Sequence, residues 1–302
     1  AGLPRFSRDG SRLVFQSRVT AVNPVAIPFD PTRERAGTPV VLDTQNNVRI
    51  PNDVSPDGTQ IALYNIGEHQ EDVFVGSTDG RMRRVTDDAP RDRGPVFTPD
   101  GRSILFYSTR DGNWAAWSVG IDGGDLRRVA GEAPGTVYLT VSPRGDRVAF
   151  VSNSGRAAYV APIGGGPPVE LPGTQVDGKF FTPMSWSRDG ARIAGTLVTG
   201  SGRPAGVGVY DLATRVTTAV SADGPAAVKW LSDGRRVVYF AKTGSELVVL
   251  DTGTRRRTGV DVRLPAPAAF NEGFAVSPDD RTIYYGAARA EAGEHDRGTL
   301  RR

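Results

Sequence analysis

Short apolar runs recur along this chain, and each follows a tight polar turn. The recurring pattern is a small polar residue, Pro or Arg, Asp-Gly, two variable residues and an alternating apolar run. It occurs seven times, in FSRDGSRLVFQS (6–17), VSPDGTQIALYN (54–65), FTPDGRSILFYS (97–108), VSPRGDRVAFVS (141–152), WSRDGARIAGTL (186–197), WLSDGRRVVYFA (230–241) and VSPDDRTIYYGA (276–287). Successive copies begin 43 to 48 residues apart. A fixed period of this length indicates a repeat architecture.

The polar turn in each copy has the composition of a tight β-hairpin. Pro presets the first central position, Asp bonds its own backbone two residues on, and Gly adopts the left-handed conformation that closes the turn. We therefore expect positive φ angles at Gly58 and Gly101. In the last copy Asp280 replaces the Gly, and Asp tolerates left-handed φ better than most residues. The residues assigned a structural turn role are Gly10, Asp57, Gly58, Asp100, Gly101, Gly145, Gly190, Gly234 and Asp280.

The period contains four short strands and no amphipathic helix. In RSILFYS (102–108) both alternating faces carry apolar residues, as expected for a strand buried between two neighbouring sheets. A third strand such as DVFVGS (72–77) and a shorter, more polar fourth strand such as RMRRVT (81–86) follow each hairpin. Four antiparallel strands per period predict an all-β fold, a β-propeller built from four-stranded blades.

The number of blades is less directly given by the pattern. Seven blade positions are predicted, near 3–46, 47–88, 94–131, 137–172, 183–220, 226–262 and 272–287, with the last one incomplete. A six-bladed ring is the alternative. The polar segment 289–302 has no alternating pattern and is expected to form a loosely held tail. On this interpretation the 272–287 hairpin packs between the sixth and first blades, and its second strand is an exposed edge.

Composition excludes several classes of protein. The 302 residues include no Cys, so disulfides and thiolate chemistry are excluded, but this leaves periplasmic and cytoplasmic locations equally open. The net charge is only +3, and acidic residues interleave with Arg throughout, which is unlike the clustered charge of a nucleic-acid-binding surface. No apolar stretch reaches 18 residues, so membrane insertion is not expected. We expect a monomeric domain without a cofactor.

Catalytic motifs are absent from the sequence. There is no G-x-S-x-G elbow, and the only two histidines are His69 and His295, so no serine-hydrolase triad can be assembled from recognisable parts. The densest polar cluster, 68–72, fits a solvated loop better than a metal site. Most Asp residues belong to the hairpin turns. We therefore assign no catalytic and no metal-ligating residue, and expect a protein that is not an enzyme and that a serine-hydrolase probe does not label.

The S-P-D-G turn, the apolar run after it and the third strands resemble the TolB-like, WD-repeat-like propeller family from residue 3 to about residue 288. The segment 23–44 is most similar to propeller halves of multidomain bacterial sensor or kinase-linked proteins. The resemblance implies a non-catalytic module that binds another protein or domain, or senses a small ligand at the propeller mouth. Two alternatives remain open: a propeller domain of a peptidase of the dipeptidyl-peptidase or prolyl-oligopeptidase type or of a glycan-active enzyme, and a periplasmic TolB-like scaffold.

Ligand contacts are expected on the face opposite the Asp-Gly turns. The loops between the second and third strands and between successive units lie there, and they vary in length and chemistry, as functional loops on a rigid scaffold do. The polar and aromatic candidates in these loops are Asn47, Arg49, His69, Glu71, Arg91, Arg110, Asp111, Trp114 and Lys179.

Overall fold

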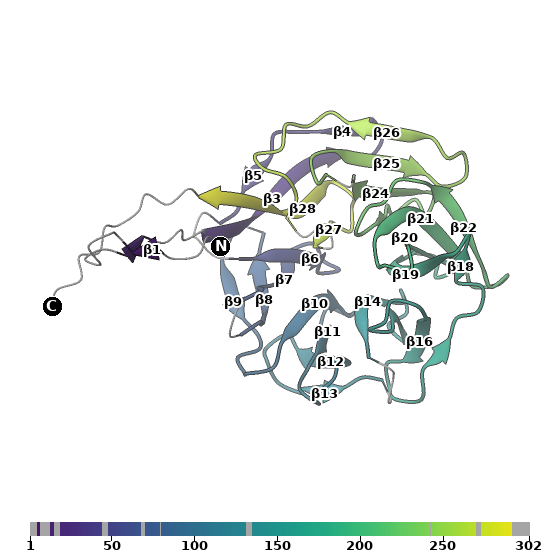
Figure 1. The fold of residues 1–302 in the computed structure, drawn as a ribbon, viewed down its shortest axis with the longest axis horizontal. Helices are drawn as coiled ribbons and strands as arrows, with labels where there is room; N and C mark the ends of the chain where they lie inside the picture. The colour runs from purple at the N-terminus through teal and green to yellow at the C-terminus, as the bar shows by residue number, and fades with distance from the viewer. Residues whose placement is uncertain are drawn as a thin grey trace.

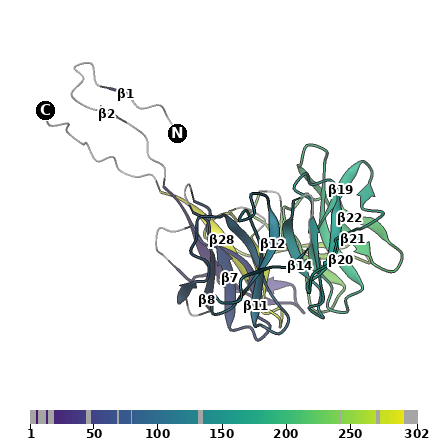
Figure 2. The ribbon, with the colours of Figure 1, turned by 90° about the horizontal axis from the view of Figure 1, so that it is seen from below.

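A computed structural model describes residues 5–6, 13–14, 19–43, 48–67, 70–78, 80–130, 135–241, 243–269 and 273–291. These residues form six antiparallel sheets of four or five strands around a central axis, together with a separate two-stranded sheet (Figure 1). In the view turned by 90° the sheets stand side by side around the ring (Figure 2). The fold is an all-β, six-bladed propeller. The predicted seven-position ring is wrong, and the six-bladed alternative is confirmed.

Five of the blades are continuous in sequence. Within each of these blades the strands are given from the axis outward; the exception is β18, a short strand that pairs with the innermost strand of its blade, β19. The five sets are β6 (Ile50–Val54), β7 (Gln60–Tyr64), β8 (Val73–Ser77), β9 (Met82–Arg84); β10 (Asp92–Phe97), β11 (Ser103–Ser108), β12 (Ala115–Gly120), β13 (Arg127–Arg128); β14 (Val137–Val141), β15 (Arg147–Val151), β16 (Ala158–Pro162), β17 (Val169–Glu170); β18 (Gln175–Val176), β19 (Lys179–Trp186), β20 (Arg192–Val198), β21 (Pro204–Asp211), β22 (Val216–Ser221); and β23 (Lys229–Trp230), β24 (Arg236–Phe240), β25 (Leu247–Asp251), β26 (Arg257–Val260). Their boundaries follow the periodic pattern of the sequence.

The sixth blade closes the ring with strands from both parts of the chain. Its strand order is β27 (Phe274–Val276), β28 (Thr282–Glu291), β3 (Val19–Asp30) and β4 (Arg35–Ala36), with β5 (Val40–Val41) also pairing with β3. β28 and β3 pair over ten residues, from Thr282 opposite Pro28 to Glu291 opposite Val19. β1 (Arg5–Phe6) and β2 (Leu13–Val14) pair with each other in a separate sheet.

This closure corrects two further expectations. The second strand of the 272–287 hairpin is not an exposed edge, because β3 occupies its outer side. Residues 289–291 continue β28 rather than starting a loose tail, whereas the remainder of the predicted tail, 292–302, lies outside the described residues, as does Gly10. The physical reason is that an unpaired sheet edge leaves a row of backbone groups without hydrogen bonds, and β3 satisfies them.

The hairpin turns have the predicted backbone geometry. Gly58 and Gly101 have φ angles of +75° and +68°, and Asp280 has +60°. In the first of these turns the Gly58 N–H donates to Ser55 O at 2.8 Å, and the Ser55 hydroxyl donates to Asp57 Oδ1 at 2.6 Å. The left-handed conformation also occurs at the remaining turn positions in the described residues, Gly145, Gly190 and Gly234.

The turns contact one another around one face of the ring. A Cβ built on Gly101 would lie 3.6 Å from Pro56 Cδ, and one on Gly145 would lie 3.2 Å from Pro99 Cδ. The same packing joins the last blade to the first, where a Cβ on Gly58 would lie 3.9 Å from the Cδ of Pro278. We call this side the turn face and the opposite side the loop face.

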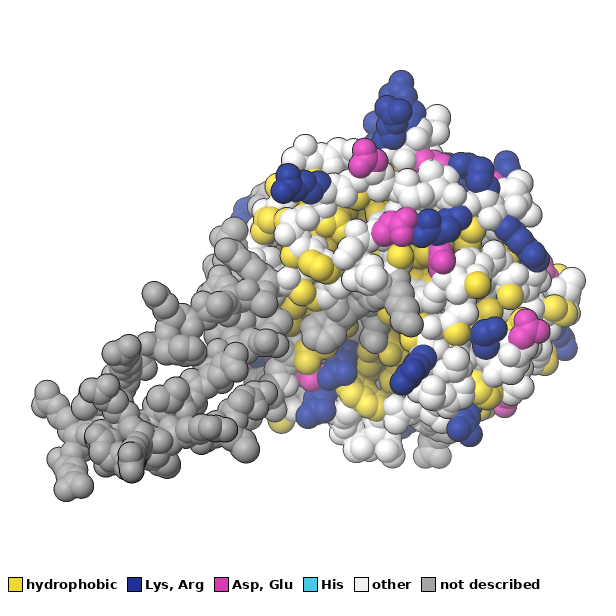
Figure 3. All heavy atoms as spheres, turned by 45° about the horizontal axis from the view of Figure 1, so that its top comes forward, with side chains coloured by type: hydrophobic (Ala, Val, Ile, Leu, Met, Phe, Trp, Pro, Cys, Tyr) yellow, Lys and Arg dark blue, Asp and Glu magenta, His cyan; other side chains and the backbone are white. Residues whose placement is uncertain are grey.

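Side chains on both surfaces of each blade form the core between neighbouring blades. All five residues of β25 are buried, and Leu105 and Phe106 of β11 are fully buried although they point to opposite sides of their sheet. The prediction of strands buried on both faces is therefore confirmed. On the outer surface in Figure 3, Lys and Arg side chains are scattered among acidic and neutral ones.

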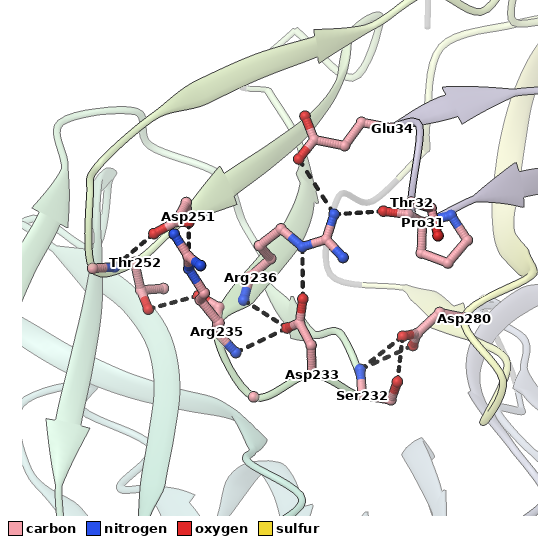
Figure 4. A network of polar contacts seen from close by, with 12 residues as sticks. Pro31, Thr32, Glu34, Ser232, Asp233, Arg235, Arg236, Asp251, Thr252 and Asp280 are labelled. Carbon is pink, nitrogen blue, oxygen red and sulfur yellow. Dashed lines mark hydrogen bonds and ion pairs between the residues drawn. The ribbon is translucent and has the colours of Figure 1, made fainter.

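An ion-pair network links the closing blade to its neighbour on the turn side (Figure 4). Glu34, in the turn between β3 and β4, accepts hydrogen bonds from Arg256 at 2.6 Å and from Arg236 at 3.3 Å. Arg236 also donates to Asp233 at 2.6 Å. Nearby, Asp280 accepts the Ser232 hydroxyl at 2.6 Å. Polar contacts thus hold the N-terminal strand and the C-terminal hairpin against the same blade.

Candidate functional site

The innermost strands of the blades carry irregularities that shape the axis. Register shifts interrupt the pairing of β6 between Pro51 and Asp53, and of β14 between Val137 and Thr140. Corresponding shifts occur in β10 and β19. β-bulges at such positions redirect side chains and are common beside functional sites. Here they bring residues six to seven positions before each turn glycine to the walls of axial cavities, namely Asn52, Gly94, Tyr138, Leu139 and Met184.

A pocket of about 440 Å³ opens among the second-to-third-strand loops of the loop face. We call it the loop-face pocket. Three aromatic side chains, Tyr107, Trp114 and Tyr138, line it. The Tyr107 ring lies 5.2 Å from the Trp114 ring and 6.3 Å from the Tyr138 ring, in both cases edge to face. Such rings provide a large, rigid contact surface at small entropic cost.

Arg93 supplies a fixed positive charge on one wall of this pocket. Its guanidinium pairs with the Glu71 carboxylate, which is only 2% exposed, and Arg93 NH2 donates to Glu71 Oε1 at 2.7 Å. The hydrogen bond that Arg93 donates to Glu71 is the main reason that the pKa of Arg93 is raised. The guanidinium carbon also lies 5.5 Å from the centre of the Trp114 ring. The charge is therefore oriented before any ligand arrives.

Hydroxyl and amide groups complete the wall. Ser152, Asn153 and Ser154 line the pocket, with Thr182 and Thr196 contributed by the next blade. The Ser152 and Ser154 hydroxyls lie 2.9 Å apart. The pocket thus combines an aromatic wall, one cation and several neutral hydrogen-bonding groups.

One pocket residue, Tyr138, has an unusual backbone conformation. Tyr138 has a φ angle of +57°, a conformation that costs a non-glycine residue about 1–3 kcal/mol. Gly94, with φ of +59°, has no room for a side chain because the Tyr107 ring packs against it. Strain of this kind persists where surrounding structure fixes it, often at binding sites.

Comparison with known proteins assigns the chain to a family. The model of the TolB β-propeller domain matches residues 3–164, more than half of the chain. The chain belongs to the TolB β-propeller family. An uncharacterised protein of Agrobacterium fabrum is 36% identical over 117 residues, which are 38% of this chain and 40% of that protein. The Tol-Pal system protein TolB of Bordetella pertussis is 46% identical over 55 residues, 18% of this chain and 13% of that protein.

A solved structure of a TolB-type protein from Agrobacterium tumefaciens has the same fold, with a TM-score of 0.69 at 18% identity. It is covered over 99% of its length by 90% of this chain. The sequence matches, by contrast, span well under half the length of the Agrobacterium fabrum protein and of the Bordetella TolB. What is shared over the whole ring is the fold.

Two of the predicted ligand residues of this TolB-family propeller meet at the loop-face pocket. Trp114 lines it, and Glu71 lies behind Arg93 and fixes its position. Arg110 is instead engaged by two carboxylates: it pairs with buried Asp92 and with partly exposed Asp88, both at 2.8 Å, and lies 5.1 Å from the Trp117 ring.

The remaining predicted residues lie elsewhere. Arg49 lies 3.9 Å over the Phe74 ring, and Asp111 pairs with Arg128 at 3.1 Å near the surface. Arg91 is exposed, and its backbone forms an isolated parallel β-bridge with Glu71. Lys179 begins β19 and pairs with Val176 of β18, while Asn47 and His69 lie outside the described residues.

The sequence interpretation missed Arg93, Tyr107, Tyr138 and Met184 because it searched the loops, whereas these residues belong to strands. The signal that could have found most of them is their offset from the turn. Arg93 and Tyr138 stand eight and seven residues before a turn glycine, and Met184 stands six before one. Among the described residues, no group of three His, Cys, Asp or Glu side chains is placed to hold a metal ion. In the same residues no helix has the length and apolar character of a membrane span.

Proposed function

We propose that this TolB-family propeller is a non-catalytic recognition module that binds an extended segment of a partner protein in the loop-face pocket. The observation that carries the proposal is the pocket itself: about 440 Å³, within the range of specific ligand sites and too small for a globular surface. A few side chains of an extended segment fill a space of this size. Tyr and Trp walls are enriched where proteins contact one another.

The lining chemistry supports recognition rather than catalysis. Among the described residues, those that line the loop-face pocket include no His, Cys, Asp or Glu, so none of them offers a general base or a paired carboxylate. The two serine hydroxyls there, Ser152 and Ser154, contact each other at 2.9 Å. Nucleophilic catalysis by Ser needs an adjacent base. A fluorophosphonate probe should therefore label no residue of the protein, and stoichiometric labelling of any Ser would overturn the non-catalytic part of the proposal.

We propose further that the propeller works as a sensing or interaction part of a larger bacterial protein. Its support is the resemblance of segment 23–44 to such propellers. Sequencing the adjoining reading frame distinguishes the possibilities. A neighbouring kinase or winged-helix domain supports this role, and a neighbouring hydrolase domain contradicts it.

The binding proposal can be tested with a phage-displayed library of random peptides selected on the immobilised chain. Affinities of the selected peptides are then measured by isothermal titration calorimetry. We expect Trp114→Ala to weaken binding at least about tenfold, because losing an aromatic contact costs roughly 1.4 kcal/mol or more. Asn153→Ala, at an exposed position of the rim, should weaken it less.

The matched control is Arg188→Ala, which changes an exposed residue in a hairpin turn on the turn face. It should leave the affinity unchanged. Peptides that bind the wild type, the Trp114 variant and the Arg188 variant equally well would show that the loop-face pocket is not the binding site.

A further inference from the structure

A second cavity lies on the same axis, nearer the turn face. It has a volume of about 200 Å³, and its walls include Asp53, Thr140, Ser185, Lys229, Trp186 and Trp230. Between it and the loop-face pocket is a hollow of about 20 Å³, lined by Asn52, Tyr64 and again Lys229. The side chain of Lys229 therefore stands between the two larger spaces. We call the second space the turn-face cavity.

Five of the residues that line the turn-face cavity come from one position of the repeat. Each blade has a residue five positions before its turn residue, and these form a set around the axis: Asp53, Val96, Thr140, Ser185, Lys229 and Ala275. Where the side chain carries oxygen, it accepts a backbone N–H from the next blade. Thr140 Oγ1 accepts from Trp186 at 3.2 Å, and Ser185 Oγ accepts from Trp230 at 3.0 Å.

Asp53 makes the same inter-blade bond with a charged group. Its Oδ2 accepts the Phe97 N–H at 2.8 Å. Thr140 and Ser185 show that a neutral hydroxyl is sufficient for this contact. Val96 and Ala275 show that the position also tolerates a small apolar side chain, so the amine of Lys229 is not required for packing either. Two of the six equivalent positions thus carry charges that ring assembly does not need.

The two charges are only partly compensated. Lys229 Nζ reaches from β23 to β6 and donates to the Asn52 carbonyl at 3.1 Å, which uses one of the three donors of an ammonium. Its interaction with Asp53 is electrostatic at longer range. Burial lowers the pKa of Lys229 and raises the pKa of Asp53, and in each case burial outweighs the attraction of the other group. Both side chains are partly exposed to the cavity, and neither has a close ion-pair partner among the described residues, so a ligand of complementary charge can pair with each of them.

We propose that the turn-face cavity binds a small zwitterion of the α-amino acid class. The ligand's carboxylate faces Lys229 and its ammonium faces Asp53. The hydroxyl hydrogens of Thr140 and Ser185 remain free to donate, because their oxygens act as acceptors in the inter-blade bonds. A volume of 200 Å³ equals that of about six or seven waters at roughly 30 Å³ each, which suits an amino acid with a small side chain. The site is independent of the peptide pocket proposed above.

The test is calorimetric titration of the full chain with glycine, L-alanine and L-serine, and in parallel with acetate and with methylammonium. We expect saturable binding of at least one amino acid at a 1:1 ratio. Acetate and methylammonium each satisfy only one of the two charges and should bind at least about tenfold more weakly.

The variants are taken from the other blades, so that each keeps the packing that the ring already uses. Asp53→Thr copies Thr140, and Lys229→Ala copies Ala275. Both should keep the wild-type circular dichroism spectrum and lose amino-acid binding at least about tenfold. Trp114→Ala, at the loop-face pocket, should bind amino acids like the wild type. The absence of saturable binding up to about 10 mM, equal binding of acetate, or retention of binding in the two folded variants would each overturn the proposal.

Discussion

Five blades of this propeller are each built from one stretch of chain, whereas the sixth is assembled from two stretches far apart in sequence. In the blade β14–β17 every pairing joins neighbouring strands along the chain. In the closing blade, β28 pairs with β3, which precedes it by more than 250 residues. The two kinds of blade bury similar apolar side chains, such as Phe150 in the first and Tyr285 in the second, both fully buried. The difference lies in the chain entropy that must be lost before the strands meet.

That difference has a large expected effect when the strands are cross-linked. The chain has no Cys, so a pair can be introduced cleanly. Asn23 and Ala287 are partners across the closing strands, and Ala149 and Val160 are partners within a continuous blade. A disulfide at Asn23→Cys and Ala287→Cys closes a very long loop and should stabilise the fold by about 5 kcal/mol, against about 3 kcal/mol for Ala149→Cys and Val160→Cys.

The measurement is the free energy of unfolding in urea, taken for each protein oxidised and reduced. The reduced forms serve as controls for the substitutions themselves. Equal stabilisation by the two disulfides would mean that closing the ring costs no more entropy than closing one hairpin, and the comparison between the two kinds of blade would then fail.

A smaller effect is expected at the turns, which the two kinds of blade share. Gly101 has a φ angle of +68° in a continuous blade, whereas the closing blade has Asp280 at +60° in the equivalent position. Gly101→Val should destabilise by about 1–3 kcal/mol, because a β-branched side chain is strained there. Gly101→Asp should cost less, since Asp tolerates this conformation. Thermal and urea unfolding measure both, and an unchanged melting temperature for the Val variant would contradict the turn assignment.

The smallest effect concerns two adjacent carboxyls of the closing turn. The hydrogen bond from the Ser277 hydroxyl is the main cause that lowers the pKa of Asp279 below its ordinary 3.8, whereas burial raises the pKa of Asp280 above it. A lowered pKa gives stability that is present above about pH 4 and lost as pH falls. A raised pKa gives stability that is complete below about pH 4 and lost as pH rises to the folded-state value.

Asp279→Asn and Asp280→Asn should therefore change the pH dependence in opposite directions. Relative to the wild type, the free energy of unfolding of Asp279→Asn should fall as pH rises through the acidic range up to about pH 4. That of Asp280→Asn should increase as pH rises above about pH 4. Urea unfolding over a series of pH values measures both slopes, and slopes of the same sign would show that the two environments are not as described.

The local parts of this fold follow from sequence, and the closure does not. The conformation of a turn residue such as Gly58 depends on neighbours only a few positions away, so the repeated motif is enough to predict it. The partner of β28 depends on a segment near the other end of the ring. Seven hairpin motifs are present for six positions, and the alternating pattern alone does not say which hairpin lies beside β3.

The candidate site shows the same division. Trp114 was predicted because it lies in a loop of the expected face. Tyr138 lines the loop-face pocket because of a bulge in β14, and no feature of the sequence predicts that bulge. Arg110 was a reasonable ligand candidate by its chemistry, yet the aspartates around it, Asp88 and Asp92, occupy its donors. Which charges are already engaged depends on contacts between blades, and those contacts become visible only in three dimensions.

The pairing of β3 with β28 brings Val19 directly opposite Glu291. A short peptide linking these two positions would make the ring covalently continuous, and the chain could then be opened between any two blades. Opened between β13 and β14, such a circular permutant would encode every blade as one uninterrupted stretch, including the one now divided. The propeller architecture is therefore expected to be independent of the order in which the blades follow one another along the chain.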